Sequence, residues 1–200
     1  MTPATGYHVV SVAGDSCTVS GSGSNYSASN ITANCAVTAT FAINTYTVTA
    51  TAGANGAITP ASQSVAHDGS ANFTVTPATG YSVVNVSGDS CTVTGSGSNY
   101  SASNITADCA VTATFAINSY TVTATAGANG TITPASQSVT HGGTANFTVT
   151  PNPGYHVASV TGQGCTVTCS GVSYSVSNIT GQCSVTATFA LSTYTVTPSV

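Results

Sequence analysis

The sequence carries almost no charge. Its 200 residues include no Lys, no Arg and no Glu, and its acids are four aspartates, Asp15, Asp68, Asp89 and Asp108. Proteins that bind nucleic acid or anionic membrane surfaces draw much of their affinity from Lys and Arg that neutralise phosphates. The lack of basic side chains therefore argues against a nucleic-acid partner and against electrostatic docking on a membrane.

Helix formers and long apolar runs are also scarce. Leu occurs once, at Leu191, and no apolar run approaches the roughly 20 residues of a membrane-spanning helix. No membrane span is predicted. The chain is instead rich in Thr (37) and Ser (28), with 41% hydrophobic residues, too many for a disordered chain. Because side chains branched at Cβ favour strands, an all-β fold is predicted.

An internal repeat of 74 residues organises the chain. "YTVTATAGANG" occurs at 46–56 and again at 120–130, and 38 of 43 positions are identical between 2–44 and 76–118. We expect Tyr46, Tyr120 and Tyr194 to mark the strand that joins each unit to its predecessor. The predicted divisions are the C-terminal part of a unit at 1–44, complete units at 45–118 and 119–192, and the first strand of a following unit at 193–200.

Each unit is predicted to hold seven or eight short strands, because period-two alternation is interrupted by frequent turns. This density indicates a small β-sandwich or barrel-like module. "GANG" at 53–56 is interpreted as a primed hairpin turn. Since only Asn118-Ser119 separates two units, neighbouring modules are expected to keep one orientation and form a rod. The last strand of the unit is expected to place Val111, Ala113, Phe115 and Ile117 on one face.

Six of the seven cysteines recur in pairs at the repeat interval, which predicts one disulfide in each module. Zinc is the rival interpretation, but the positions that both complete units share offer two thiols and one His, where zinc requires four ligands. Disulfides persist in oxidising compartments, so a secreted or cell-surface protein is expected. Cys169 is left over, either as a free thiol or as a cross-link between chains. The predicted pairs are Cys17–Cys35, Cys91–Cys109 and Cys165–Cys183.

No arrangement of residues predicts catalysis. "HDGS" at 67–70 holds the residue types of a hydrolytic triad, but such triads converge from separate segments, and the next unit reads "HGGT". We interpret these residues as a turn. His8 and His156 correspond to Ser82, so a metal or acid/base role of these histidines is not expected to repeat through the array. Asp15 and Asp89 are interpreted as turn residues. The chain is not expected to be an enzyme or to bind a cofactor or metal.

Two surface patterns are candidates for interaction. The first is the Asn-x-Ser/Thr triplet, a glycosylation acceptor that a chain of this composition also produces by chance. It occurs at Asn25, Asn30, Asn72, Asn85, Asn99, Asn104, Asn129, Asn146 and Asn178. Sugars on the Thr hydroxyls are an alternative, and attached glycans would keep an uncharged surface soluble.

The second pattern is the Thr-x-Thr row at 38–40, 45–51 and 119–125. Outward Thr side chains stand about 6.6–6.8 Å apart along a strand. Rows of this spacing can match an ice lattice, although the twist of short strands opposes a flat plane. Cross-strand pairing that stabilises the sheet is the simpler interpretation.

Residues 120–162, "YTVTATAGANGTITPASQSVTHGGTANFTVTPNPGYHVASVTG", resemble a divergent internalin-B-type repeat. The shared features are "YTVT", the Gly/Asn turn, "ITP", "HGG", the "FTVTPNPGYHVASVTG" segment and a closing "VTATF", and the resemblance covers essentially the whole chain. It implies an extracellular, non-enzymatic bacterial module of the kind found in long surface or secreted proteins. The paired cysteines are an elaboration of that pattern.

A structural segment of a bacterial extracellular fibre, stalk or surface array is the leading functional hypothesis. The sequence opens in mid-unit and closes on an unpartnered first strand. It is therefore either a window on a longer chain or a subunit that self-associates by strand complementation. The alternatives are an adhesin that binds carbohydrate through exposed aromatics, Tyr26, Tyr100 and Tyr174, and an ice-binding protein that uses the Thr rows.

Overall fold

The computed structural model describes residues 1–197, and none of these is helical. The strands fall into three successive groups that follow the 74-residue repeat. Contacts divide the chain into two compact units, one of residues 1–77 and 83–115, the other of residues 78–82 and 116 onward. No helix in the described part is long and apolar enough to cross a membrane. The predicted all-β fold is confirmed.

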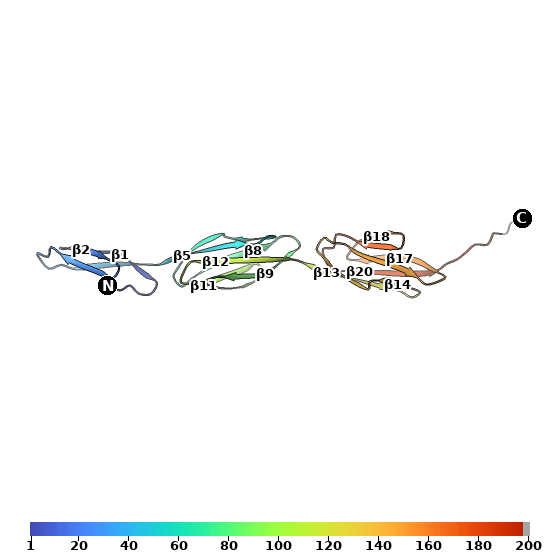
Figure 1. Ribbon diagram of the computed structural model, residues 1–200, viewed down its shortest axis with the longest axis horizontal. Helices are drawn as coiled ribbons and strands as arrows, with labels where there is room; N and C mark the ends of the chain where they lie inside the picture. Colours follow the sequence, from blue (N-terminus) through green and yellow to red (C-terminus); the bar gives the residue numbers. More distant parts are fainter. Residues whose placement is uncertain (198–200) are drawn as a thin grey trace. The chain divides into compact units, whose positions relative to one another are not determined.

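The middle module contains eight strands in two four-stranded sheets (Figure 1). One sheet has the strand order β7-β5-β12-β9 and the other β10-β11-β8-β6. The sheets do not close into a barrel, so the sandwich is the correct form of the two predicted. The strands are β5 (Thr45–Ala52), β6 (Gly56–Thr59), β7 (Ser62–Ala66), β8 (Gly69–Pro77), β9 (Tyr81–Gly88), β10 (Thr92–Ser96), β11 (Asn99–Ile105) and β12 (Cys109–Ile117).

The third module repeats this topology with the sheets β15-β13-β20-β17 and β14-β16-β19-β18. Its strands are β13 (Ser119–Ala126), β14 (Gly130–Thr133), β15 (Ser136–Thr140), β16 (Ala145–Pro151), β17 (Tyr155–Gln163), β18 (Val167–Ser170), β19 (Ser173–Val176) and β20 (Cys183–Leu191). The sequence predicts a strand at 193–200. Residues 192–197 form no strand, and residues 198–200 lie outside the described residues.

Residues 1–44 form only the second half of a module. β1 (Tyr7–Gly14) pairs with β4 (Val37–Ile43), and β2 (Thr18–Ser22) pairs with β3 (Asn25–Ser29). These pairs correspond to β9 with β12 and to β10 with β11. Nothing in the described chain takes the place of β5 to β8 against them.

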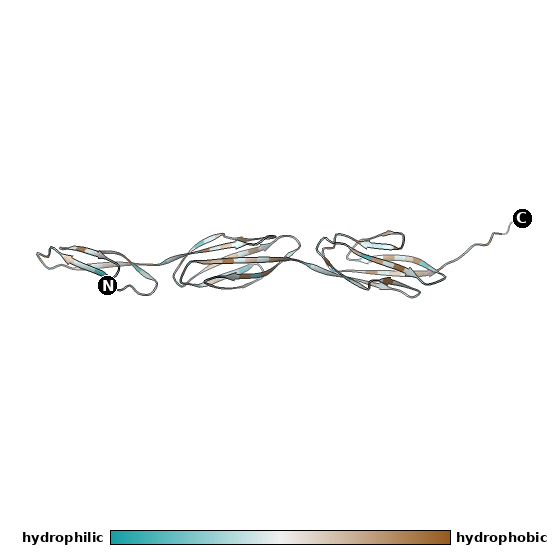
Figure 2. Cartoon of the chain, viewed as in Figure 1, coloured by the Kyte–Doolittle hydropathy of each residue, from teal (hydrophilic) through white to brown (hydrophobic). Residues whose placement is uncertain are grey.

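The core of each complete module lies between its two sheets. In the middle module Val48 and Val111 contribute from one sheet, and Phe73 and Ala102 from the other. Alternation places every second residue of these strands inside, and Figure 2 shows hydrophobic residues as brown bands along the strands. The buried face of β12 ends at half-buried Phe115, because Ile117 lies where the strand leaves the sandwich and is 41% exposed. Burial along this predicted face therefore decreases from Val111 and Ala113 to Ile117.

The turn at 53–56 is also different from the prediction. β5 and β6 belong to opposite sheets, so "GANG" carries the chain across the sandwich and makes no hairpin. The φ angle of Asn55 is positive, at 70°, whereas the φ angle of Gly56 is not positive. A Cβ at Gly56 would overlap the Phe115 ring, so close approach to an aromatic ring explains this glycine. The prediction of a turn at 53–56 is confirmed, but the prediction that this turn joins the two strands of a hairpin is wrong.

A parallel strand pair closes each complete module. β5 runs parallel to β12 with Val48 opposite Cys109, and β13 runs parallel to β20 with Val122 opposite Cys183. The first strand of a module therefore lies beside its own last strand. One residue, Asn118, then leads from β12 into β13, the first strand of the next module.

Candidate functional site: the joint between repeats

A single asparagine forms each joint, and both of its backbone polar groups are hydrogen-bonded. The N–H of Asn118 donates to the Gly80 carbonyl at 2.8 Å, and its carbonyl accepts from the His141 N–H at 2.8 Å. Asn44 makes the same two bonds in the first joint, to Gly6 at 2.7 Å and from His67 at 2.9 Å. The linker is thus held by the turn before it and by the module after it.

The turn that receives the linker contains a glycine with a positive φ. The Tyr81 N–H donates to the Ala78 carbonyl at 3.0 Å, and Gly80 has a φ of +81°. A Cβ on Gly80 would overlap the His141 ring. In the first joint a Cβ on Gly6 would overlap the His67 ring in the same way. Both the backbone conformation and the imidazole therefore require glycine.

The imidazole lies between this turn and a tyrosine of its own module. The ring centroids of Tyr46 and His67 are 6.0 Å apart, as are those of Tyr120 and His141. The His67 side chain is 14% exposed. In both histidines Nδ1 is buried and finds no hydrogen-bond partner within the described chain. These rings serve as packing surfaces.

The two joints differ in their polar surroundings. In the first, His8 Nδ1 lies 2.8 Å from Asn44 Oδ1, and Asp68 Oδ2 lies 3.6 Å from His67 Nε2. In the second, Ser82 and Gly142 occupy the positions of His8 and Asp68. At the end of the third module the Ser192 N–H again donates to a glycine carbonyl, that of Gly154, at 2.8 Å.

Sequence reasoning found part of this site. It singled out the short Asn118-Ser119 link together with Tyr46, Tyr120 and Tyr194, and the first two tyrosines lie at the joints. Tyr194 is 87% exposed and in no strand. The contact of Gly80 with His141 was missed. The available signal was the recurrence of "GY" and of His67 and His141 at the 74-residue interval.

The predicted turn residues lie in turns. His67 and Asp68 form the turn between β7 and β8. The Asp89 carboxylate accepts from the Ala110 N–H at 2.8 Å, and this bond holds the pKa of that carboxyl below its ordinary value of 3.8. Asp15 accepts from Ala36 at the same distance. Over residues 1–197 no group of three or more His, Cys, Asp or Glu is placed to hold a metal ion.

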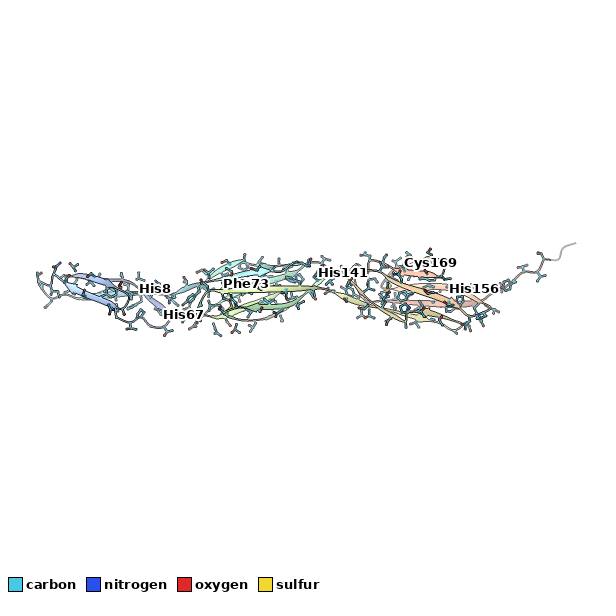
Figure 3. The ribbon with its side chains drawn as sticks, in the orientation of Figure 1. His8, His67, Phe73, His141, His156 and Cys169 are labelled. Carbon is cyan, nitrogen blue, oxygen red and sulfur yellow. A yellow bond between two sulfur atoms is a disulfide. The ribbon has the colours of Figure 1, made fainter. Side chains whose placement is uncertain are left out.

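Each repeat contains one disulfide, which confirms the prediction. The pairs are Cys17–Cys35, Cys91–Cys109 and Cys165–Cys183, with Cα atoms 5.8, 6.0 and 5.7 Å apart. Cys91 precedes β10 in one sheet and Cys109 begins β12 in the other, so the bond ties the two layers together. Cys169 is a free, exposed thiol on β18 (Figure 3).

All nine asparagines of the Asn-x-Ser/Thr triplets are exposed. Three of them, Asn30, Asn104 and Asn178, have positive φ values of 55–57° at equivalent positions. Exposure permits glycosylation of these residues, which stays a prediction.

The aromatic side chains proposed for carbohydrate binding are not fully exposed. Tyr100 and Tyr174 are half-buried and pack against the two cores, and Tyr26 is half-buried too. Their strands pair them with core residues, Tyr100 with Phe73 and Tyr174 with Phe147. A groove of about 700 Å³ beside Tyr100 is lined by Thr59, Pro60, Asn72, Phe73, Thr74, Thr94, Gly95, Asn99 and Ser101.

The Thr rows point outward. Thr45, Thr47, Thr49 and Thr51 are exposed on β5, and the adjacent strand β7 places Ser64 beside Thr47 and Ser62 beside Thr49. Thr112 of β12 lies opposite Thr51. On β5, β7 and β12 this face therefore carries a group of uncharged hydroxyls, with the Asp108 carboxylate beside Thr47.

These features define a tandem-repeat β-sandwich protein with one disulfide per repeat. The chain belongs to the divergent InlB B-repeat domain family, whose sequence model matches residues 1–45, 46–119 and 120–193. The resemblance inferred from the motifs is thereby confirmed, with family boundaries one residue later than the predicted divisions. No curated protein and no solved structure matches the chain. Tandem repeats fit a longer repeat chain, and the disulfides and the family are consistent with an extracellular location.

Proposed function

We propose that this chain is a stiff, non-enzymatic segment of a bacterial extracellular fibre, stalk or surface array. Its family supports a tandem extracellular structural module. The disulfide in each β-sandwich supports a module that resists unfolding outside the cell. A chain without Lys or Arg also presents no site to trypsin-like proteases.

The observation that carries this proposal is that both backbone polar groups of the linker residue Asn118 are hydrogen-bonded. A flexible tether exposes its backbone groups to water, whereas the N–H and carbonyl of Asn118 are both bonded to protein. The glycine turn and the histidine ring add a packed contact at the same place. Rotation at the linker would break two hydrogen bonds and separate the ring from the turn.

Distances between spin labels on two modules test the stiffness. One label is attached to the free thiol of Cys169 and the other to a Thr112→Cys variant, since both positions are exposed. We expect one narrow distribution of distances, which Gly80→Ala broadens. A broad distribution without that substitution would overturn the proposal.

Ice binding is a second candidate function, favoured by the hydroxyl face around Thr47, Thr49 and Thr51. The row of uncharged hydroxyl groups supports it. The Asp108 carboxylate, which accepts a hydrogen bond from the Thr47 N–H at 2.8 Å, and the twist of the strands oppose it. Thermal hysteresis of the purified chain, lost in a Thr49→Lys variant, would support this role. Freezing behaviour equal to that of an inert protein would exclude it.

Carbohydrate adhesion is favoured by the groove beside Tyr100, whose lining includes asparagine, threonine and serine residues. Binding on a glycan array that is lost with Tyr100→Ala would support it. Because Tyr100 packs on the core, folding of that variant must be checked first. A folded wild-type chain that binds no glycan would count against adhesion.

A further inference from the structure

Each joint buries one nitrogen of an imidazole ring without giving it a polar partner. Nδ1 of His67 and Nδ1 of His141 are both buried, and neither has a hydrogen-bond partner among the described residues. In a neutral imidazole one nitrogen carries the hydrogen and the other is a bare acceptor. In a protonated ring both nitrogens carry a hydrogen, so Nδ1 becomes a buried donor with no acceptor. That arrangement costs free energy for as long as the ring stays in place.

The elements around His141 bring no negative charge to its ring. Tyr120 of β13 faces the ring, with the two centroids 6.0 Å apart, and a phenol is uncharged in acid. The turn before the linker, residues 78–80, and the turn after the histidine, Gly142-Gly143-Thr144, contain no titratable side chain. The loop that bonds to this second turn does so through the backbone of Ile179.

The aspartates nearest in the sequence, Asp89 and Asp108, lie at the other end of β12. Asp89 accepts from Ala110 near the start of that strand, and Asp108 directly precedes the strand, whereas Asn118 follows its end. No acidic residue follows Asp108 in the 200-residue sequence. A protonated His141 ring therefore has no counter-charge beside it.

The first joint has such a counter-charge. Asp68 Oδ2 lies 3.6 Å from His67 Nε2, and Gly142 takes the place of Asp68 in the second joint. The other titratable group of the first joint is His8, whose Nδ1 lies 2.8 Å from the side-chain oxygen of Asn44. A positive charge on the histidine ring is thus partly offset in the first joint and not in the second.

We propose that His141 makes the second joint sensitive to acid: a ring that takes up a proton leaves the turn at Gly80, and the joint loosens. The two hydrogen bonds of Asn118 go to Gly80 and from His141, so they open with the ring. Because water can solvate both nitrogens only in the open joint, acid favours opening. The closed joint is therefore stable above the ordinary histidine range, about pH 6.5, and weakens as the pH falls below it. The inference rests on the proposed function, since loosening has a consequence only in a joint that is otherwise stiff.

Amide hydrogen exchange of the full chain at about pH 7.5 and about pH 5.0, corrected for intrinsic exchange rates, tests the inference. Uptake of one proton raises the equilibrium constant for opening about tenfold per pH unit below the histidine range. We expect the protection of the Asn118 and His141 amides to fall about tenfold or more. His141→Phe keeps a ring against the turn without a titratable nitrogen, so it should abolish this loss.

The matched control is His156→Gln. His156 is the other histidine of the third repeat, is exposed, and pairs with Ala190 near the end of β20. The strand partner of Tyr120, Val139, and the register of Val122 with Cys183 place the joint near the opposite end of that strand. His156→Gln should therefore leave the acid-dependent loss of protection unchanged.

Gly142→Asp supplies the missing counter-charge. The position accepts Asp, because Gly142 has a φ of +76°, Asp68 has a φ of 61° at the equivalent place, and a Cβ on Gly142 meets no atom within 4 Å. Since the Asp68 side chain is 71% exposed, the added carboxylate should be exposed too and should reduce the acid-dependent loss only about twofold to fivefold.

The inference is overturned if the protection of both amides is independent of pH, if a folded His141→Phe variant keeps the loss, or if His156→Gln removes it. Should His141→Phe not fold, Gly142→Asp decides, because an unchanged loss with the added carboxylate contradicts the role of charge. The spin-label distances at neutral pH decide the proposed function separately. A narrow distribution together with protection that does not depend on pH removes only the acid sensitivity.

Discussion

Single residues fix the geometry of the joint, and glycine is the clearest case. Gly80 and Gly154 occupy equivalent turns with φ values of +81° and +83°. A Cβ on Gly80 would meet the His141 ring, whereas one on Gly154 would meet open space. The two positions therefore separate the cost of the backbone conformation from the cost of the contact.

Gly154→Ala should lower the free energy of unfolding by about 1 to 2 kcal/mol, the usual penalty for an L-residue in this conformation. Gly80→Ala should cost more and should change the NMR signals of the His141 ring. Chemical denaturation with ring resonances as a second probe measures both. If the two substitutions lower the free energy of unfolding equally, the contact between the His141 ring and the turn at Gly80 contributes nothing to stability.

Asp89 predicts a local dependence of stability on pH. The hydrogen bond from Ala110 holds the pKa of the folded Asp89 carboxyl below its ordinary value of 3.8. A depressed pKa contributes stability that is complete well above pH 3.8 and is lost as the pH falls through the lower, folded-state pKa. Unfolding of wild type and Asp89→Asn should therefore differ at neutral pH and converge in strong acid.

The third module supplies a control for this prediction. Gly162-Gln163-Gly164 replaces the Asp-containing turn, so no carboxylate occupies the position there. Hydrogen exchange of the amide that corresponds to Ala110, that of Ser184, should show no loss of protection specific to acid. A difference between wild type and Asp89→Asn that persists unchanged at low pH would contradict the assignment.

At the scale of elements, the disulfide substitutes for a larger core. Cys91 and Cys109 link the two sheets and enclose 17 residues, a loop whose closure stabilises by roughly 3 kcal/mol. Replacing both with Ser should destabilise the middle module by about 2 to 4 kcal/mol in urea unfolding. Cys169→Ser should change stability by less than about 0.5 kcal/mol, because that thiol is exposed and free. A doubly substituted module as stable as wild type would show that the sandwich does not need the bond.

The strands themselves could be predicted from the sequence, but their partners could not. Alternation along 45–52 and 109–117 reports which side of a strand is buried, and the structure buries Val48 and Val111 as expected. Alternation does not report which strand lies beside which. The parallel pairing of β5 with β12 spans about 60 residues, and the crossing at 53–56 uses residues that hairpins also prefer.

The joint shows the same limit. Its short length is visible in the sequence, and so is the recurrence of Gly80 and His141. That these two residues touch depends on the fold of two successive repeats, which no local pattern encodes. The disulfide pairs were predictable because the cysteines recur as pairs at the repeat interval.

At the scale of the whole molecule, the proposed function requires that neighbouring modules do not reorient freely. Residual dipolar couplings of residues 45–118 and 119–192, measured in one weakly aligned sample, test this most directly. We predict that the two modules share one alignment tensor in magnitude and in orientation, and that Gly80→Ala reduces the couplings of one module relative to the other. Two modules with tensors of clearly different magnitude in the wild-type chain would contradict the account, because they would be moving independently.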